Sequence, residues 1–247
     1  MREFPRLYAG LYRTFRADLP FWRQMAFAAG GPILELGSGT GRVAADLARR
    51  GFIVTGIDSD PAMLAWAEQH RPPLPADALS YVQGDIAEFR LPKDFSLVLC
   101  PCNTLAMLSR DQAQRALRCG RQHLLPGGVF AAELPHPRDV RAGGVNPLSP
   151  LAAFLDVETG EPVQVSAEQR FDGERRAAKV EWRLDELSRD GHVQRHLLRQ
   201  TLQLWEPAEV QRAVQAAGFA GSSLLGGYRA QNYDEHSHRM LVVAVAP

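Results

Sequence analysis

Short apolar runs separated by helical patterns dominate the first half of the chain. The runs at 33–36, 52–57, 79–83 and 95–99 have the length and composition of strands that are buried on both faces. Between the first two runs, apolar residues recur at helical spacing over 43–48. Strands that alternate with helices predict an α/β fold built on a parallel sheet.

The second half of the chain continues this sheet and adds to it. A helix is expected over 112–125, a strand over 129–134, and a further helix from Pro207, since proline suits a first helical turn. The last two strands, 219–225 and 240–245, are expected to form an antiparallel hairpin at one edge. The sequence therefore predicts a sheet of seven strands with helices on both of its faces.

Residues 136–205 depart from this alternation. Asp-Gly turns separate three segments with strand character: 163–171, 177–187 and 192–204. We expect an antiparallel insert over the carboxyl edge of the main sheet, where a substrate would enter, with Trp182 or Trp205 behind its pocket. A dimer surface is the alternative role, and one insert can serve both.

The part of the chain before the first strand, residues 4–29, fits one or two amphipathic helices. The chain is long enough for one α/β domain, 1–247, with an ample core. Its expected segments are an N-terminal helical cap, a core in two stretches and an insert: 1–30, 31–135 with 206–247, and 136–205.

Three glycines after the first strand are the centre of the chemistry. Gly37, Gly39 and Gly41 let the backbone turn tightly and approach a ligand where a Cβ would collide. The helix that follows directs its free N–H groups back at this turn. Asp58 ends the second strand, about twenty residues further on, where an acid is placed to bind a ribose diol. The stretch therefore predicts a nucleoside-binding βαβ unit.

The glycine turn and Glu35 before it read E-x-G-x-G-x-G, which resembles motif I of the class I S-adenosylmethionine (SAM) methyltransferases. The LLPGG turn at 124–128, followed by an apolar strand, is another feature of that family. The resemblance covers 31–134 and 206–247. It implies a Rossmann-like, seven-stranded class I methyltransferase fold, SAM as cofactor and S-adenosylhomocysteine as product.

The resemblance also implies which residues contact the cofactor. In that family the glycine loop holds the amino-acid end of SAM, and the acid after the second strand takes the ribose hydroxyls. An acid after the third strand meets the adenine, and a tyrosine near the start often faces the cofactor, here Tyr8 or Tyr12. The predicted cofactor-binding residues are Tyr8, Arg13, Glu35, Gly37, Ser38, Gly39, Gly41, Asp58, Ser59, Met63, Asp85, Ile86, Pro101 and Cys102.

The same resemblance favours a small acceptor. Residues 95–108, FSLVLCPCNTLAML, look like the version found in small-molecule methyltransferases and lack the Asp/Asn-Pro-Pro-Tyr motif of amino-methylating DNA enzymes. The 28 basic and 28 acidic residues cancel, whereas binding to a nucleic acid requires clustered positive charge. We therefore expect methyl transfer to N or O of a small molecule and no nucleic-acid partner, with a homodimer left open.

Two other functions stay open. An NAD-dependent oxidoreductase is disfavoured because Arg42 stands where the dinucleotide fingerprint has its third glycine. A non-catalytic SAM-binding module is compatible with intact cofactor residues, since no obligatory catalytic residue can be identified in this family.

One residue is a candidate general base. His136 follows the fifth strand of the expected sheet, between two prolines that fix the backbone, and a histidine can accept a proton near neutral pH. A surface loop histidine is the other interpretation of His136, and Glu133 is a competing base. An amine acceptor would need no base, whereas a hydroxyl would.

The remaining composition predicts an ordinary cytoplasmic protein. The three cysteines form neither a disulfide framework nor a zinc pattern. His236 and His238 lack a third ligand nearby, so no metal site is expected. The N-terminus lacks an apolar signal core, and no run approaches the length of a membrane span.

Overall fold

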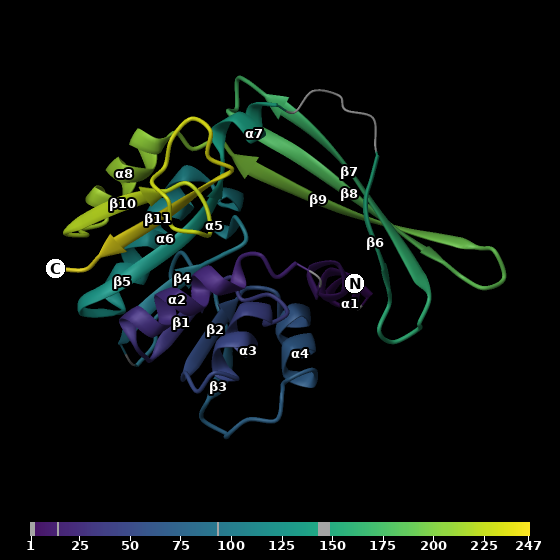
Figure 1. The fold of residues 1–247 in the computed structure, drawn as a ribbon, viewed down its shortest axis with the longest axis horizontal. Coiled ribbons are helices and arrows are strands. Elements are labelled where there is room, and N and C mark those ends of the chain that lie inside the picture. Colours follow the sequence, from purple (N-terminus) through teal and green to yellow (C-terminus); the bar gives the residue numbers. More distant parts are fainter. Residues whose placement is uncertain (1–2, 14, 93, 143–148) are drawn as a thin grey trace.

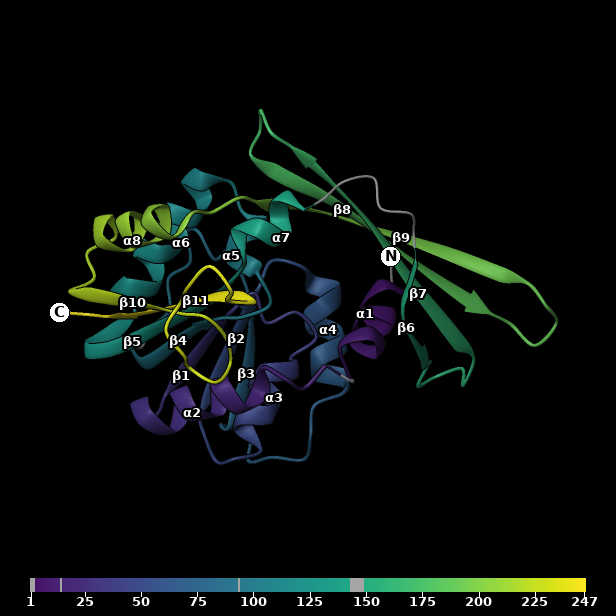
Figure 2. The same ribbon diagram turned by 45° about the horizontal axis from the view of Figure 1, so that its top comes forward.

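The computed structural model describes residues 3–13, 15–92, 94–142 and 149–247. In these ranges the strands form a seven-stranded sheet, sheet A, and a four-stranded sheet, sheet B, which projects from one side of it (Figures 1 and 2). The strands of sheet A are β1 (Ile33–Leu36), β2 (Val54–Asp58), β3 (Leu79–Gln83), β4 (Phe95–Cys100), β5 (Leu124–Pro135), β10 (Gly221–Leu225) and β11 (Arg239–Val245).

Sheet A has the order β10-β11-β5-β4-β1-β2-β3. Strands β1 to β5 pair in parallel, β11 runs antiparallel to β5, and β10 closes the edge as a hairpin with β11. The predicted α/β sheet of seven strands with a C-terminal hairpin at one edge is therefore confirmed.

Both faces of sheet A are buried, as the continuous apolar runs indicated. Leu34 and Leu36 face one hydrophobic cluster, and Ile33 faces the other. The first cluster includes residues of α6 and α8, and the second includes residues of α2 and α3. The helices of the described chain are α1 (Glu3–Arg13), α2 (Leu19–Ala29), α3 (Arg42–Ala48), α4 (Pro61–Gln69), α5 (Thr104–Met107), α6 (Arg110–Gln122), α7 (Pro137–Arg141) and α8 (Pro207–Ala216).

Sheet B is the predicted antiparallel insert, but it has four strands rather than three. Its strands, in sheet order, are β6 (Ser149–Leu155), β7 (Pro162–Asp172), β8 (Ala177–Leu187) and β9 (Val193–Gln203). Strand β6 and helix α7 both lie before residue 163, where the first strand of the insert was expected. The sequence of β6 lacks alternation and contains Pro150, which is tolerated because β6 is an edge strand whose register shifts at that point.

The inner face of sheet B packs against α1. Leu7 forms a buried cluster with Val163, Val165 and Leu184, and Trp182 packs at its margin. Trp205, the other tryptophan expected behind the insert's pocket, lies instead in the main core, in the cluster that contains α6 and α8.

A buried ion cluster joins the same two parts. The guanidinium of Arg6, on α1, lies 2.6 Å from the carboxylate of Asp156 and 2.7 Å from that of Glu186. His196 of β9 contacts the other oxygen of Glu186 at 2.7 Å. Helix α1 and sheet B are therefore held together by both apolar and ionic contacts.

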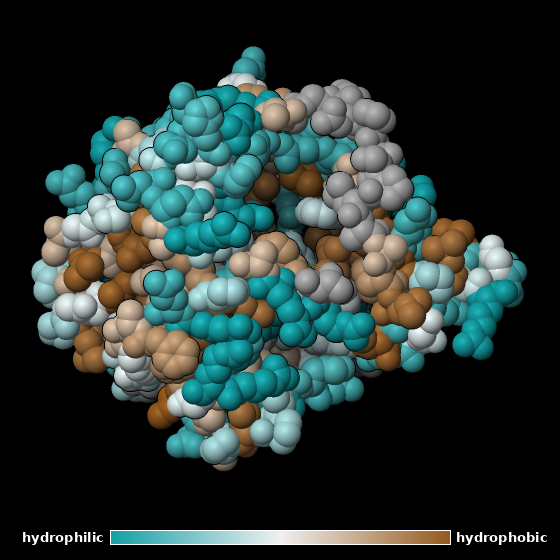
Figure 3. Space-filling model, viewed as in Figure 1, coloured by the Kyte–Doolittle hydropathy of each residue, from teal (hydrophilic) through white to brown (hydrophobic). Residues whose placement is uncertain are grey.

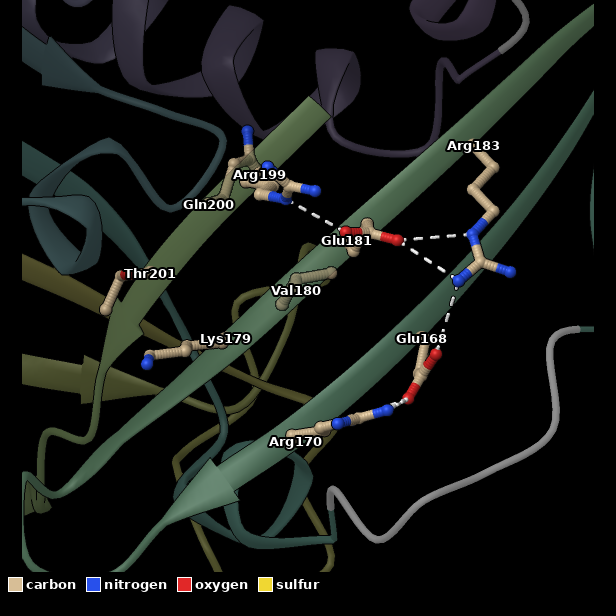
Figure 4. Close-up of a pocket in the computed structure, with 9 residues that line it drawn as sticks. All are labelled: Glu168, Arg170, Lys179, Val180, Glu181, Arg183, Arg199, Gln200 and Thr201. Atoms are coloured by element: carbon tan, nitrogen blue, oxygen red, sulfur yellow. Dashed lines mark hydrogen bonds and ion pairs between the residues drawn. The ribbon is translucent and has the colours of Figure 1, made fainter. Parts of the chain in front are cut away.

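The outer face of sheet B is covered by charges of alternating sign, as Figure 4 shows. Glu181 lies 2.9 Å from Arg199 and 3.1 Å from Arg183, and Arg183 also lies 3.5 Å from Glu168. Glu168 in turn pairs with Arg170 at 2.5 Å. Ion pairs near the surface each contribute little to stability, so this face is not what holds sheet B in place.

Among the helices of the described ranges, none combines the length and the apolar character needed to cross a membrane. The division into a helical cap, a core and an insert stays a prediction.

The Arg6 cluster makes a first testable prediction. Arg6→Leu is expected to lower the free energy of unfolding by ~3 kcal/mol, because two buried carboxylates lose their countercharge. Urea denaturation followed by circular dichroism measures this loss. The control is Arg115→Leu, which breaks an exposed pair with Asp111 on α6 and is expected to cost less than ~0.5 kcal/mol. Equal losses of unfolding free energy in the two variants would show that the Arg6 cluster stabilises the fold no more than an exposed ion pair does.

Candidate active site

A cleft of about 270 Å³ lies at the carboxyl edge of sheet A. The glycine loop, the ends of β2 and β3, and α5 form its floor and sides, while α1 and β9 close it from above. Its lining residues are Phe4, Tyr8, Gly37, Gly39, Asp58, Ser59, Asp60, Met63, Asp85, Ile86, Thr104, Met107, Leu108, Leu198 and Gln200. Figure 3 shows the surface hollowed between sheet A and the insert strands, with hydrophobic side chains inside the hollow.

The loop after β1 requires glycine for two separate reasons. Gly37 has a φ of +72°, and a Cβ on it would lie 2.4 Å from Cγ2 of Thr104. Gly39 has a φ of +53°, and its N–H donates to Oδ2 of Asp58 at 2.7 Å. The tight backbone therefore brings the loop directly against the end of β2.

Asp58 organises the next part of the cleft. Its other carboxylate oxygen accepts a hydrogen bond from the N–H of Asp60 at 2.9 Å, and Asp60 caps α4 by accepting from Ala62. Asp85 has the same arrangement after β3, where its carboxylate accepts from the N–H of Ala87 at 2.8 Å. Both acids are held at strand ends with their side chains in the cleft wall, as binding to the polar groups of a nucleoside requires.

Glu35 lies behind the glycine loop and is almost fully buried. Burial raises the pKa of this carboxyl to about 8, although Arg42 and the backbone of Ala44 oppose the shift. Its Oε2 has no hydrogen-bond partner among the described residues, and the same is true of the buried Oδ1 of Asn103. Two buried acceptors without donors beside the loop fit a ligand with a positively charged amino group, which SAM carries at its amino-acid end.

The segment between α1 and α2 is fixed to the start of α3 by a buried ion pair. Nη1 and Nη2 of Arg42 donate to the two carboxylate oxygens of Asp18 at 2.8 and 2.6 Å. Asp18 is fully buried and also accepts from the indole N–H of Trp22 at 3.0 Å. Burial alone would lower the pKa of Arg42, but the hydrogen bonds to Asp18 outweigh it and raise that pKa. Arg42 is therefore a charged structural link.

A pair of tyrosines forms the wall of the cleft at α1. The ring centroids of Tyr8 and Tyr12 are 4.6 Å apart, and Tyr8 reaches the cleft. Burial raises the pKa of Tyr12 to about 12, so its hydroxyl stays protonated at neutral pH. Arg13 is exposed and lines a separate groove on the other side of this wall.

The turn after β4 has an unusual backbone. Cys102 and Asn103 have φ values of 56° and 60°, a left-handed conformation that costs free energy in residues with a side chain. The N–H of Cys102 donates to Oε2 of Glu133 at 3.2 Å. Oε1 of Glu133 accepts from Tyr228 at 2.7 Å and from Arg239 at 2.6 Å. Glu133 therefore holds the turn in place, and both of its oxygens are occupied.

His136 lies at the end of β5, where it caps α7. Its Nδ1 accepts a hydrogen bond from the N–H of Arg138 at 3.1 Å, and its ring stacks on Tyr233. Its buried Nε2 has no partner among the described residues. Burial, with the nearby charge of Arg138, lowers the pKa of His136, so its imidazole is neutral at pH 7.

The cleft brings together the predicted residues Tyr8, Gly37, Gly39, Asp58, Ser59, Met63, Asp85 and Ile86. It does not include Arg13, Glu35, Ser38, Gly41, Pro101, Cys102 or His136 in its lining. Of these, Glu35 and Ser38 are buried, and Gly41 lines the same groove as Arg13. The role of each residue in binding stays a prediction.

The sequence reasoning did not find the contributions of α5 and β9. Thr104, Met107 and Leu108 follow the turn after β4, so their place in the motif was a usable signal. Leu198 and Gln200 sit on β9 with no local signal, because only the pairing of β9 with β8 turns them inward.

Comparisons with known proteins agree with this geometry. Residues 33–128 match the model of a family described as a methyltransferase domain. A probable SAM-dependent methyltransferase of Mycolicibacterium smegmatis is 33% identical over 152 residues, which are 60% of this chain and 55% of that protein. The solved CcbJ methyltransferase of Streptomyces caelestis is 25% identical, with a TM-score of 0.76 and coverage of 94% of this chain and 91% of its own. Residues 33–128 therefore match a methyltransferase domain, and the whole chain has the fold of the class I SAM-dependent methyltransferases.

The resemblance to the class I SAM methyltransferases seen in the sequence is therefore confirmed. The SAM-bound amino pentose methyltransferase CalS10 of Micromonospora echinaspora is similar in fold, at 24% identity and a TM-score of 0.73, over 98% of this chain and 97% of that one. The chain spans about half the length of the curated relatives that it matches.

Asp58 gives the second testable prediction. Asp58→Ala is expected to weaken SAM binding by ~1.5–3 kcal/mol, the usual worth of hydrogen bonds to a charged group. Isothermal titration calorimetry with SAM measures the change, and Asp77→Ala, an exposed acid outside the cleft, is the matched control. Unchanged affinity in Asp58→Ala would remove this residue from the cofactor site.

Glu35 gives a prediction on pH. In the folded protein Glu35 keeps its proton up to about pH 8, whereas in the unfolded chain it loses the proton near the usual pKa of a glutamate. At pH values between these two pKa values, the folded state therefore binds more protons than the unfolded state. The contribution of Glu35 to stability is therefore full below the unfolded pKa and is lost as pH rises towards 8, at roughly 1.4 kcal/mol per pH unit at the steepest. Glu35→Gln removes this slope.

Denaturation of wild type and Glu35→Gln without cofactor, from pH 5 to 9, tests this expectation. As pH rises, the free energy of unfolding of Glu35→Gln should increase relative to that of the wild type. Parallel pH curves for the two proteins would show that Glu35 is ionised throughout.

Proposed function

We propose that this methyltransferase moves a methyl group from SAM to a nitrogen or oxygen of a small molecule, with an amine as the favoured acceptor. The observation that carries the proposal is that α1 and β9 both contribute to the lining of the cleft. Leu198 and Gln200 of sheet B line the same cleft as Asp58 and the glycine loop. A cleft of about 270 Å³ between these elements suits a small acceptor better than a polymer.

Each part of the chain has a role in this proposal. SAM supplies an electrophilic methyl group on a sulfonium. Gly37 and Gly39 make room for its amino-acid end, Glu35 is buried behind the loop next to that end, Asp58 holds the ribose, and Asp85 with Ile86 holds the adenine. The covering elements exclude water and orient the acceptor, so alignment of two reactants is the main catalytic contribution.

The charges near the turn after β4 favour an amine. Glu133, the buried acid nearest to this turn, already accepts three hydrogen bonds and is paired with Arg239, so it has no free oxygen for a substrate proton. An amine that arrives unprotonated needs no such base. CalS10, named as an amino pentose methyltransferase, is consistent with this choice through its fold.

A hydroxyl acceptor, with His136 as the general base, is the second candidate. Because Nδ1 of His136 accepts from the N–H of Arg138, the neutral ring carries its proton on Nε2. His136 would therefore act as a base only through Nδ1, after release of that hydrogen bond. A non-catalytic SAM-binding role, a homodimer, a cytoplasmic location and the absence of a nucleic-acid partner also stay predictions.

Product analysis tests the proposal directly. The purified protein is incubated with SAM and a panel of small primary and secondary amines and matched alcohols, and mass spectrometry follows methylated product and S-adenosylhomocysteine. We expect turnover with a subset of the amines. SAM binding without turnover of any acceptor in the panel would favour the non-catalytic role.

The pH dependence of the rate separates the two acceptors. If His136 is the base, the wild-type rate falls as pH drops through its pKa, which burial places below ~6.5. His136→Ala should then lose about a hundredfold or more in kcat and lose this acidic limb. His238→Ala, an exposed histidine, is the control. A small change in kcat with an unaltered pH profile would contradict a catalytic role for His136.

A further inference from the structure

A second groove, distinct from the cofactor cleft, lies on the other side of the tyrosine pair. It has a volume of about 450 Å³ and runs between the α1–α2 segment and the outward surfaces of α3 and α4. Tyr12 forms part of its wall, and Thr40 and Gly41 of the glycine loop form its inner end. Hydrophilic residues gather over this part of the molecule in Figure 3, where Figure 1 places α3 and the α1–α2 segment.

The groove has an excess of positive charge that the protein does not neutralise. Arg42 is one of its lining residues, but Asp18 takes up that charge. Asp46, the lining acid, is already paired with Arg23 at 2.8 Å and Arg50 at 3.0 Å, neither of which lines the groove.

Three further arginines face the groove: Arg13, Arg16 and Arg49. All three are exposed, and none has an ion pair or side-chain hydrogen bond among the contacts of the described residues. Because the chain as a whole has a formal net charge of zero, three unpaired guanidinium groups in one hollow are a local excess. Guanidinium groups that converge on a cavity match the geometry of phosphate oxygens.

An aromatic platform lies in the same groove. The rings of Trp66, on α4, and His70, the residue that caps the end of α4, stack at 3.7 Å with 19° between their planes. Nδ1 of His70 lies 2.9 Å from the carbonyl of Trp66, which fixes the ring and leaves Nε2 free to contact a ligand. The platform offers a planar surface next to the three arginines.

We propose that this groove binds the diphosphate group of a phosphorylated small molecule. Arg13, Arg16 and Arg49 hold the phosphate oxygens, and the platform of Trp66 and His70 supports a ring that the ligand carries. Residues of α1, α3 and α4, the α1–α2 segment and the glycine loop line the groove, and its volume of about 450 Å³ favours a small ligand over a nucleic acid. Its inner end is the loop of the cofactor cleft, so a ligand here lies against the backbone that holds SAM.

Calorimetric titration of the full chain with inorganic pyrophosphate, at fixed ionic strength maintained with chloride, tests the proposal. We expect saturable binding to the wild type and affinity at least ~tenfold weaker in Arg16→Gln/Arg49→Gln, which removes two charge-assisted contacts. The control, Arg90→Gln/Arg118→Gln, removes the same charge from exposed sites that line neither groove nor cleft and should bind as the wild type does.

Two further measurements complete the test. Melting temperatures of both double variants, measured without ligand, should equal that of the wild type, which shows that the fold is intact. Adenosine diphosphate, compared with pyrophosphate, should bind more tightly if the platform supports a ring, and Trp66→Leu should remove only that difference.

Three outcomes would overturn the proposal: no pyrophosphate binding to the wild type, equal weakening in the two double variants, or binding to an RNA oligonucleotide with none to pyrophosphate. Because no readout depends on methyl transfer, the proposed function can fail while this site is upheld, and the reverse also holds.

Discussion

The arrangement of the whole cofactor edge depends on one buried ion pair, between Asp18 and Arg42. Asp18 is fully buried, and the two oxygens of its carboxylate accept from both terminal nitrogens of Arg42. Leaving either charge without the other in that environment would cost several kcal/mol. The pair therefore fixes the chain before α2 to α3, the helix after the glycine loop. In this way the Asp18–Arg42 contact, which is not part of the cleft lining, helps to position α1 over the cleft.

Arg42 also contacts an aromatic ring that it shares with a second arginine. Its guanidinium lies 5.5 Å from the ring centroid of Phe15, and that of Arg239 lies 5.7 Å from the same ring. Arg239 is also the partner of Glu133, which holds the left-handed turn at Cys102. A chain of neighbouring charges and rings thus extends from the glycine loop, through the N-terminal segment, to the last strand of sheet A.

Local patterns predicted the parts of the molecule that local physics decides. The alternation of apolar runs and helical segments gave the α/β sheet, because strands of sheet A are buried on both faces and read as continuous apolar runs. The glycines and Asp58 placed one side of the cleft, since their conformations are set within a single βαβ unit. Tyr8 lies in the cleft as the family resemblance implied, although the pattern of α1 could not separate it from Tyr12.

Long-range contacts decided what the sequence could not predict. Arg42 appeared in the sequence only as a departure from the dinucleotide fingerprint, and nothing local connects it with Asp18. The fourth strand of sheet B was missed because β6 has no alternation and joins its neighbour through a shifted register. Trp205 follows directly after strand residues of the insert, yet it is buried in the core of sheet A, because the chain turns back towards α8 at that point.

The contacts between α1 and sheet B have a consequence for protein engineering. Sheet B leaves the core after β5 and returns before α8, so it looks like a unit that can be exchanged between relatives to change the acceptor. Yet Gly10 of α1 leaves no space for a Cβ beside the ring of Phe154, and Arg6 is matched to two acids of the insert. A chimera that receives a foreign insert must therefore receive the matching first helix as well, although more than a hundred residues of chain separate them.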